Sequence, residues 1–236
     1  MNRLALMLLR NLGKLPGAYG KLCRFAREPE KYSWQQMWDH IQYMMDLAVR
    51  AGNVDLQVYG KENIPVGQGC MLYANHQGMF DVLAIAASCP VPLGVVYKQE
   101  LKNVPLLKQI YACTNSYAMD RADVRQSLTV IQAVTQQVLK GRTYLIFPEG
   151  TRSRKGNEMV EFHAGSFRCA LKAKCPIVPM AFIDSFRVLD QKGSAPVTVQ
   201  LHYLEPIPYE QYKDMKTAEL AQLVQSKIRQ AIDENK

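Results

Sequence analysis

Residues 70–97 read CMLYANHQGMFDVLAIAASCPVPLGVVY, and this stretch shows the pattern that decides the fold. Its apolar run Cys70–Tyr73 predicts a short buried strand, and Asp81–Ser88 predicts a helix. A second strand is predicted at Leu93–Tyr97, after the breakers Pro90 and Pro92. A strand, a helix and a strand in succession are typical of a sheet with parallel strands.

The same alternation of strands and helices continues on both sides of this stretch. Further strands are predicted at Val54–Tyr59, Ser116–Met119, Tyr144–Phe147, Ile177–Ile183 and Val197–Tyr203. Further helices are predicted at Pro105–Tyr111, from the cap Asp123 to Gly141, at Phe167–Lys174 and from Thr217 onwards. We therefore expect an α/β fold with a mixed, largely parallel central sheet flanked by helices.

An N-terminal amphipathic helical pair is predicted before this alternation begins. Residues Leu4–Leu9 are apolar nearly all round, and Gly13 ends the first helix. Ser33 and Gln36 form a capping box at the start of the second helix, and Gly52 ends it.

The surface of this helical pair has two interpretations. Trp34 and Trp38 are the two tryptophans of the chain and lie one turn apart, and six Lys and Arg residues precede the first acid, Glu28. The pair either packs on the core or docks on a membrane, with Trp and Leu at the acyl boundary and cations at the headgroups. The cations and tryptophans favour the membrane. We expect a membrane-docking segment at residues 1–52 and one domain at residues 53–236.

The composition is that of an ordinary globular protein. The chain has 236 residues, of which 48% are hydrophobic and 21% charged, which excludes a largely disordered or collagen-like chain. The run Leu4–Leu9 is too short to span a bilayer, and two prolines interrupt Val82–Tyr97, so we expect no transmembrane helix. The six cysteines form no C-x-x-C pair, and we expect free thiols in a reducing, cytoplasmic compartment.

The net charge of +8 favours a polyanionic partner. Composition alone leaves anionic lipid, nucleic acid and an acidic carrier protein open. We expect no nucleic-acid partner, because the sequence has no recognition motif for one. It also has no phosphate-binding loop of the G-x-x-x-x-G-K-[ST] type, no G-x-S-x-G nucleophile motif and no metal-ligand spacing.

The first motif with chemical potential is Asn75-His76-x4-Asp81. His76 follows a predicted strand, at the end of the sheet where α/β proteins place their sites, and Asp81 falls in the first turn of the next helix. A carboxylate bonded to one imidazole nitrogen raises the basicity of the other, so the pair could take a proton from an alcohol. The structural alternative is a core histidine beside a neighbouring acid.

The second motif is Phe147-Pro148-Glu149-Gly150-Thr151-Arg152, which also follows a predicted strand. Gly150 lets the backbone approach a ligand closely, Thr151 supplies a hydroxyl, and Arg152 supplies a planar fork that suits phosphate. The structural alternative is a solvated basic turn.

The two motifs together resemble those of the glycerolipid acyltransferase family, and within it the 1-acylglycerol-3-phosphate acyltransferases. Tyr117–Arg121 resembles the family's strand that ends in a phosphate-binding arginine, and Ile177–Met180 resembles its late strand with Val178 and Pro179. The similarity runs from about residue 54 to 205. Phe162-His163 departs from the Phe-Lys that members often carry.

The resemblance implies transfer of a fatty acyl group from a thioester, acyl-CoA or acyl carrier protein, to the sn-2 hydroxyl of 1-acylglycerol 3-phosphate. It implies that His76 is the general base and Asp81 orients it, with no cofactor and no metal. It implies phosphate binding by Arg121, Glu149, Gly150, Thr151 and Arg152, and further substrate contacts at Asn75, Lys98, His163 and Pro179. Backbone amides near the start of the helix that contains Asp81 are candidates for the oxyanion donors.

This family resemblance also predicts a peripheral protein at the cytoplasmic face of the membrane, because the substrate is a lipid. Anionic lipid, lysophosphatidic acid and the acyl donor are then the expected partners. Three alternatives stay open: another acceptor such as glycerol 3-phosphate or a different lysophospholipid, a thioesterase in which water replaces the alcohol, and a lipid-binding module without activity.

Overall fold

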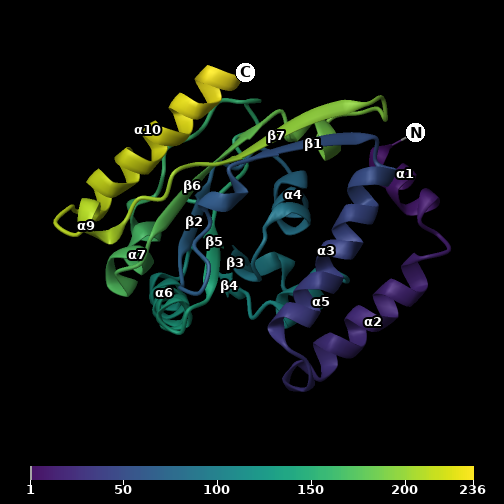
Figure 1. The fold of residues 1–236 in the computed structure, drawn as a ribbon, viewed down its shortest axis with the longest axis horizontal. Coiled ribbons are helices and arrows are strands. Elements are labelled where there is room, and N and C mark those ends of the chain that lie inside the picture. The colour runs from purple at the N-terminus through teal and green to yellow at the C-terminus, as the bar shows by residue number, and fades with distance from the viewer. Residues whose placement is uncertain (1) are drawn as a thin grey trace.

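The computed structural model describes residues 2–236 and shows one twisted sheet with helices on both faces (Figure 1). Residue 1 of the predicted membrane-docking segment lies outside the described residues. The strands are β1 (Val54–Tyr59), β2 (Met71–Ala74), β3 (Leu93–Lys98), β4 (Tyr117–Met119), β5 (Thr143–Ile146), β6 (Ile177–Ile183) and β7 (Val197–Tyr203).

The strands are ordered β1-β7-β6-β2-β5-β3-β4 across the sheet. All neighbours run parallel except β6 and β7, which pair antiparallel with Met180 opposite Tyr203. The predicted mixed, largely parallel sheet is therefore confirmed. Strand β2 lies between β5 and β6, with Tyr73 opposite Ile146 on one side and Pro179 on the other. The carboxyl ends of these three parallel strands therefore meet at one edge of the sheet.

The helices lie before, between and after the strands. They are α1 (Arg3–Arg10), α2 (Leu15–Arg27), α3 (Trp34–Ala51), α4 (Phe80–Ser88), α5 (Leu107–Cys113), α6 (Val124–Leu139), α7 (Arg168–Ala173), α8 (Phe186–Leu189), α9 (Tyr209–Tyr212) and α10 (Thr217–Asn235). Short 3₁₀ helices are η1 (Pro29–Lys31), η2 (Lys61–Asn63), η3 (Gln99–Leu101) and η4 (Ala164–Phe167). Figure 1 shows α3 and α4 on one side of the sheet and α6, α7 and α10 on the other.

Two apolar cores form because successive side chains of a strand point to opposite faces. Leu72 and Ala74 of β2 lie in the core beneath α3 and α4. Met71 and Tyr73 lie in the core beneath α6, α7 and α10. Both faces of β2 are buried, which explains why its sequence is apolar throughout and does not alternate.

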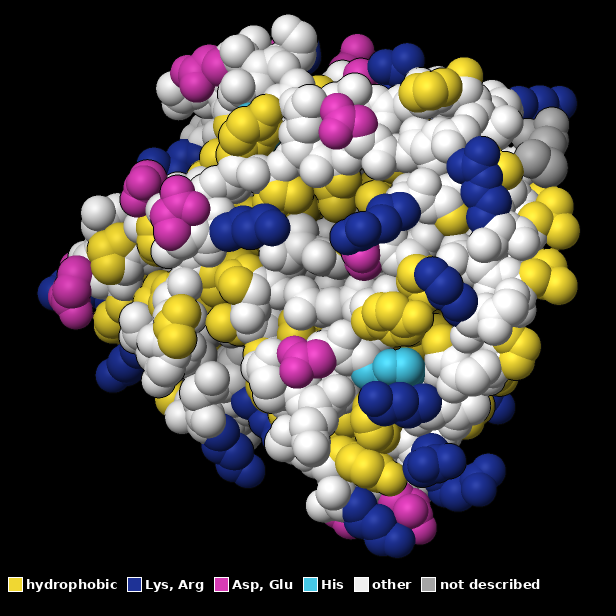
Figure 2. Space-filling model, turned by 45° about the vertical axis from the view of Figure 1, so that its right-hand side comes forward, with side chains coloured by type: hydrophobic (Ala, Val, Ile, Leu, Met, Phe, Trp, Pro, Cys, Tyr) yellow, Lys and Arg dark blue, Asp and Glu magenta, His cyan; other side chains and the backbone are white. Residues whose placement is uncertain are grey.

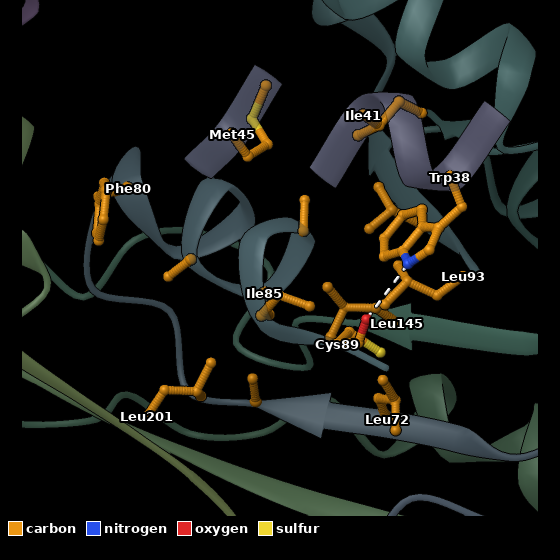
Figure 3. Close-up of a cluster of buried hydrophobic side chains, with 14 of the residues drawn as sticks. Trp38, Ile41, Met45, Leu72, Phe80, Ile85, Cys89, Leu93, Leu145 and Leu201 are labelled. Carbon is orange, nitrogen blue, oxygen red and sulfur yellow. Dashed lines mark hydrogen bonds between the residues drawn. The ribbon is translucent and has the colours of Figure 1, made fainter. Parts of the chain in front are cut away.

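Helix α3 belongs to the first of these cores. Figure 3 shows Trp38, Ile41 and Met45 of α3 above Ile85 of α4, with strand residues such as Leu72 below them. Trp38 is 2% exposed, and its indole N–H donates to the carbonyl oxygen of Cys89 at 3.3 Å. The expectation that the tryptophans face a membrane is therefore wrong for Trp38. The amphipathic pattern of α3 serves packing on the domain.

Trp34 is half-buried and is covered by a cation. The guanidinium of Arg142 lies 4.3 Å from the centre of its ring. A cation over an aromatic face is a stabilising contact within the protein. Trp34, too, is held by the domain.

The N-terminal region contains one helix more than predicted. Helix α2 has Pro16 in its first turn and two glycines, Gly17 and Gly20, which disfavour a helix in isolation. It forms because Leu22 and Phe25 are buried against the rest of the chain. Tertiary packing overrides the weak local preference here.

Helix α1 is tied to the domain by its first residue. Arg3 is buried, and its guanidinium donates to the carbonyl oxygens of Gly52 at 2.6 Å, Ala195 at 2.8 Å and Val188 at 3.0 Å. The opposite side of this helix and its end expose four leucines: Leu4, Leu8, Leu9 and Leu12. Figure 2 shows hydrophobic side chains in yellow along the right-hand edge of the molecule, with dark blue Lys and Arg side chains near them.

No helix within residues 2–236 combines the length and apolar character needed to cross a bilayer.

Candidate active site

The loop between β2 and α4 places the first motif at the carboxyl edge of the sheet. His76 Nδ1 lies 2.7 Å from Asp81 Oδ2, and the His76 side chain is 20% exposed. The ring also stacks on Phe147, with centroids 4.1 Å apart and planes at 25°. Phe147 follows β5, the neighbour of β2, so strand adjacency brings the two motifs together.

Asp81 is fully buried, and its carboxylate accepts four hydrogen bonds. Oδ2 accepts from His76 Nδ1, from the Gln77 amide at 2.7 Å and from the Gly78 amide at 3.0 Å, while Oδ1 accepts from the Ser185 hydroxyl. These donors replace the water that the buried carboxylate has lost. Because an ionised carboxylate only accepts, Nδ1 of His76 bears the proton and Nε2 is the basic nitrogen.

Glu149 of the second motif supports the main chain of His76. It is 2% exposed, its Oε1 accepts the His76 amide N–H at 2.7 Å, and its Oε2 accepts the Val160 amide at 3.0 Å. Burial raises the pKa of this carboxyl to about 7. The amide of Ser153, the residue after the second motif, donates to the His76 carbonyl oxygen at 2.9 Å, so Glu149 and Ser153 hold the N–H and the carbonyl group of His76.

The amides of the first-motif loop are engaged by three carboxylates. His76 donates to Glu149, Gln77 and Gly78 donate to Asp81, and the Met79 amide donates to Asp190 Oδ2 at 2.8 Å. These amides were the expected oxyanion donors. In the structure they serve to fix the loop instead.

Arg121, Gly150 and His163 converge beside this loop. Gly150 has φ 75°, and a β-carbon there would lie 2.7 Å from a guanidinium nitrogen of Arg121 and 3.0 Å from Cδ2 of His163. Glycine is therefore required both by the backbone conformation and by the close approach of the two side chains. The predicted phosphate-binding Arg121 and the substrate-contact candidate His163 thus lie together.

A cavity of about 330 Å³ opens at these three residues. Arg121, Gly150, His163 and Arg168 supply its polar edge. The apolar part of its wall consists of Val96, Met119, Val124, Leu128, Ile131, Ile146 and Phe147. The cavity therefore combines cationic groups with a hydrophobic wall, and it shares Phe147 with the ring of His76.

Arg152 and Thr151 of the second motif do not line this cavity. The Arg152 guanidinium forms an ion pair with Asp190, and both side chains are partly exposed. Asp190 also accepts the Met79 amide, so it joins Arg152 to the start of α4. Thr151 is exposed.

Three further predicted residues lie outside the cavity lining. Asn75 is buried, and its side-chain amide exchanges two hydrogen bonds with the backbone of Phe182, at 2.7 and 3.1 Å. Pro179 lies within β6 opposite Tyr73. Lys98 is exposed at the end of β3 and pairs with Glu100 at 2.7 Å.

The sequence did not point to Ser185, which follows β6 and supports Asp81, or to the side chains that hold Ser185 in place. Ser185 donates to Asp81, and its amide donates to Gln77 Oε1 at 2.9 Å. Gln77 Nε2 donates in turn to Asn157 Oδ1 at 2.8 Å and to the Phe182 carbonyl oxygen at 2.9 Å. One feature of the sequence could have identified Ser185: it comes just after a predicted strand. Polar residues at that place lie at the same edge of the sheet as His76.

Comparison with known proteins agrees with this geometry. A family model described as Acyltransferase matches residues 55–183, which include both motifs. The chain belongs to the acyltransferase family. The match ends at Ile183, the last residue of β6.

Three of the curated relatives that the chain matches are named 1-acyl-sn-glycerol-3-phosphate acyltransferase. The Saccharomyces cerevisiae protein is 29% identical over 179 residues, which cover 74% of this chain and 59% of the relative. The Salmonella typhimurium and Escherichia coli proteins are each 30% identical over 162 residues, which cover 68% of this chain and 66% of each relative. The chain thus matches under two thirds of the length of these relatives.

The fold of the chain is also similar to that of a solved structure. The crystal structure of the 1-acyl-sn-glycerophosphate (LPA) acyltransferase PlsC from Thermotoga maritima superposes with a TM-score of 0.78. The comparison covers 99% of this chain and 97% of that one at 22% identity. The whole chain, N-terminal helices included, therefore shares this fold.

Proposed function

We propose that the protein transfers an acyl group from a thioester to the sn-2 hydroxyl of 1-acylglycerol 3-phosphate and so forms phosphatidic acid. The observation that carries this proposal is the position of the His76–Asp81 pair beside a cavity with cationic and apolar walls. The names of the relatives support the same reaction. The reaction needs no cofactor, and acyl-CoA or acyl carrier protein enters as the second substrate.

The proposed reaction begins with proton removal by His76. Nε2 takes the proton of the sn-2 hydroxyl while the oxygen attacks the thioester carbonyl. The tetrahedral intermediate then loses its thiolate, which takes the proton back from the imidazolium. Asp81 holds the ring and stabilises its charge between the two steps, because its carboxylate bonds to Nδ1. A thioester is already activated, so no protein nucleophile is required.

The acceptor phosphate binds, in this proposal, at the convergence of Arg121 and His163 on Gly150. Arg121 supplies a planar fork that suits phosphate oxygens, and the glycine lets the backbone come close. The apolar wall of the cavity suits the alkyl chain of the same molecule. Lys98, which lies outside the cavity lining and pairs with Glu100, would contribute positive charge only on release from that ion pair. Arg152 becomes available to a phosphate when it leaves Asp190.

These features favour the lysolipid over the open alternatives. Glycerol 3-phosphate has no alkyl chain that could contact the apolar wall of the cavity. A lipid-binding module without activity needs no histidine oriented by a buried carboxylate, such as His76 beside Asp81. A thioesterase would use the same base, so only the products separate it from a transferase.

The test is a product analysis by mass spectrometry. Purified protein is mixed in micelles with acyl-CoA or acyl carrier protein thioester and with one acceptor: 1-acylglycerol 3-phosphate, glycerol 3-phosphate or lysophosphatidylcholine. The proposal predicts phosphatidic acid from the first acceptor at least tenfold faster than product from the others. Free fatty acid alone identifies a thioesterase, and absence of any product with both donors contradicts the proposal.

We also propose that the protein docks peripherally on the cytoplasmic face of the membrane through α1. The support is the row of exposed leucines on this helix and the surrounding Lys and Arg side chains (Figure 2). The six cysteines are all free in the structure, as in a reducing compartment. Anionic lipid is the partner that suits this surface.

Deletion of residues 1–52 cannot test this docking, since Trp38 and its neighbours in α3 belong to the core. The sharper test is the double substitution Leu8→Gln and Leu12→Gln, with Leu139→Gln at the exposed end of α6 as the matched control. The double variant should lose at least tenfold in binding to anionic vesicles, and the control should bind like the wild type. Equal binding by all three proteins would contradict docking through α1.

A further inference from the structure

Ser185 lies outside both motifs and contacts the carboxylate of Asp81. It follows β6 and is 0% exposed. Its hydroxyl donates to Oδ1 of Asp81, 104 residues away in the chain. Its amide donates to Oε1 of Gln77, the residue next to His76.

Two oxygens lie within hydrogen-bond distance of the Ser185 hydroxyl, and Oδ1 of Asp81 is the better acceptor. Three donors already bind Oδ2 of Asp81, whereas the Ser185 hydroxyl is the donor to Oδ1 within residues 2–236. Oε1 of Gln77 lies 3.1 Å from the same hydroxyl, but it receives the Ser185 amide N–H. A bond to an ionised carboxylate is stronger than one to an amide oxygen, so the proton goes to Asp81.

The backbone fixes this hydroxyl in place. Asp184, the preceding residue, has φ 63°, and its amide donates to Asn157 Oδ1 at 2.9 Å. Gln77 donates to the same Asn157 oxygen and to the Phe182 carbonyl. These hydrogen bonds join the end of β6 to the His76 loop and hold the Ser185 backbone beside Asp81.

We propose that Ser185 is a positioning residue that acts on His76 through Asp81. It holds the plane of the carboxylate so that Oδ2 meets Nδ1 of His76. It also draws part of the negative charge to Oδ1, which limits how strongly the carboxylate favours the protonated imidazole. The consequence for catalysis rests on the proposed function, in which His76 is the base.

Several other charged groups face His76. Asp81 does so from α4, and Glu149 does so through its bond to the His76 amide. Arg121 and His163 meet at Gly150 in the neighbouring loop, and the Arg152–Asp190 pair adjoins Met79. Substitution of Ser185 leaves each of these groups in place. A difference between the wild type and a Ser185 variant therefore reports on the contact with Asp81.

The experiment compares Ser185→Ala with Ser88→Ala. Ser88 is a matched control because it is buried in the last turn of α4, where its hydroxyl donates to the Ala84 carbonyl oxygen at 2.7 Å and contacts the Tyr203 hydroxyl, away from Asp81. Each variant is assayed for kcat, for KM of the lysolipid and for pH dependence. The ring of His76 is also titrated by NMR, which needs no turnover.

Ser185→Ala should lower kcat about 10- to 100-fold, the usual effect of removing one hydrogen bond from a buried charge, with KM changed less than about twofold. The acid limb of the activity profile and the midpoint of the His76 titration should both move to higher pH, because more negative charge remains at Oδ2. Ser185→Cys keeps the size and a weak donor, and it should fall between wild type and Ser185→Ala. Ser88→Ala should change none of these quantities.

Wild-type kcat and an unchanged His76 titration in Ser185→Ala would overturn the proposal, as would equal effects of the Ser88 and Ser185 substitutions. If Ser185→Ala fails to fold, Ser185→Cys carries the same test. If the proposed function is wrong, the wild type forms no phosphatidic acid. The NMR titration of His76 needs no turnover, so it still shows whether Ser185 acts on His76 through Asp81.

Discussion

Glu149 Oε1 accepts the amide hydrogen of His76 at 2.7 Å, so the acid of the second motif holds the main chain of the histidine in the first. Both of its oxygens are occupied by backbone amides, and its side chain is buried. The family resemblance implied phosphate binding for this residue. The structure supports a different interpretation, in which Glu149 joins the two motifs.

The raised pKa of Glu149 predicts a change of stability with pH. A carboxyl whose pKa rises from 4.5 to about 7 on folding stabilises the protein fully below 4.5 and loses that contribution as the pH rises through 7. The free energy of unfolding of the wild type should therefore fall by about 3 kcal/mol relative to Glu149→Gln between pH 4.5 and 8. Urea unfolding of both proteins measures this, and a constant difference between them would contradict the assignment.

Arg121 should be the main ligand of the acceptor phosphate. Arg121→Ala removes a charged fork from the cavity and should raise KM for the lysolipid about 30-fold or more, with a smaller effect on kcat. Arg125 is exposed on α6 outside the cavity lining, so Arg125→Ala is the matched control. Steady-state kinetics with varied lysolipid measures both, and equal KM values for the two variants would place the phosphate elsewhere.

Asp190 should compete with substrate phosphate for Arg152. Asp190→Asn weakens the ion pair but keeps an oxygen for the Met79 amide, so KM for the lysolipid should fall about threefold. The double variant Asp190→Asn with Arg152→Ala should lose this gain and bind the lysolipid more weakly than the wild type. A higher KM in Asp190→Asn alone would mean that the ion pair holds Arg152 in its binding position.

Trp38 should contribute strongly to stability, although the segment around it was expected to dock on a membrane. Trp38→Ala empties a fully packed site between α3 and α4 and should cost about 3–5 kcal/mol of unfolding free energy. Trp34→Ala removes a half-buried ring and should cost less than half as much. Chemical denaturation measures the unfolding free energy of both variants. A small effect of Trp38→Ala would contradict the packing of α3 in the core.

The sequence predicts those elements whose pattern is local. β6 and β7 have the predicted bounds because the apolar run of β6 and the alternating pattern of β7 are both local signals. His76 contacts Asp81 because only four residues lie between them, across the start of α4. Helix α2 was missed because its glycines disfavour a helix until Leu22 and Phe25 are buried.

The missed features depend on contacts between distant parts of the chain. No spacing rule connects Ser185 with Asp81 or Arg152 with Asp190, because the fold alone brings them together. The prediction for Trp38 was wrong for a related reason: the sequence pattern of an apolar helix face is the same whether the face contacts a membrane or a protein core. The sequence thus predicts the contact between His76 and Asp81, and the structure shows which residues support them.

In the proposed reaction His76 is the base, and turnover by His76→Ala tests this role directly. His202→Ala is the matched control, since His202 lies in β7 and contacts Gln200 and Tyr59 away from the site. With folding and lysolipid binding confirmed for both variants, formation of phosphatidic acid should fall at least about 1,000-fold in His76→Ala and stay at the wild-type rate in His202→Ala. Turnover by His76→Ala within tenfold of the wild type would contradict the account.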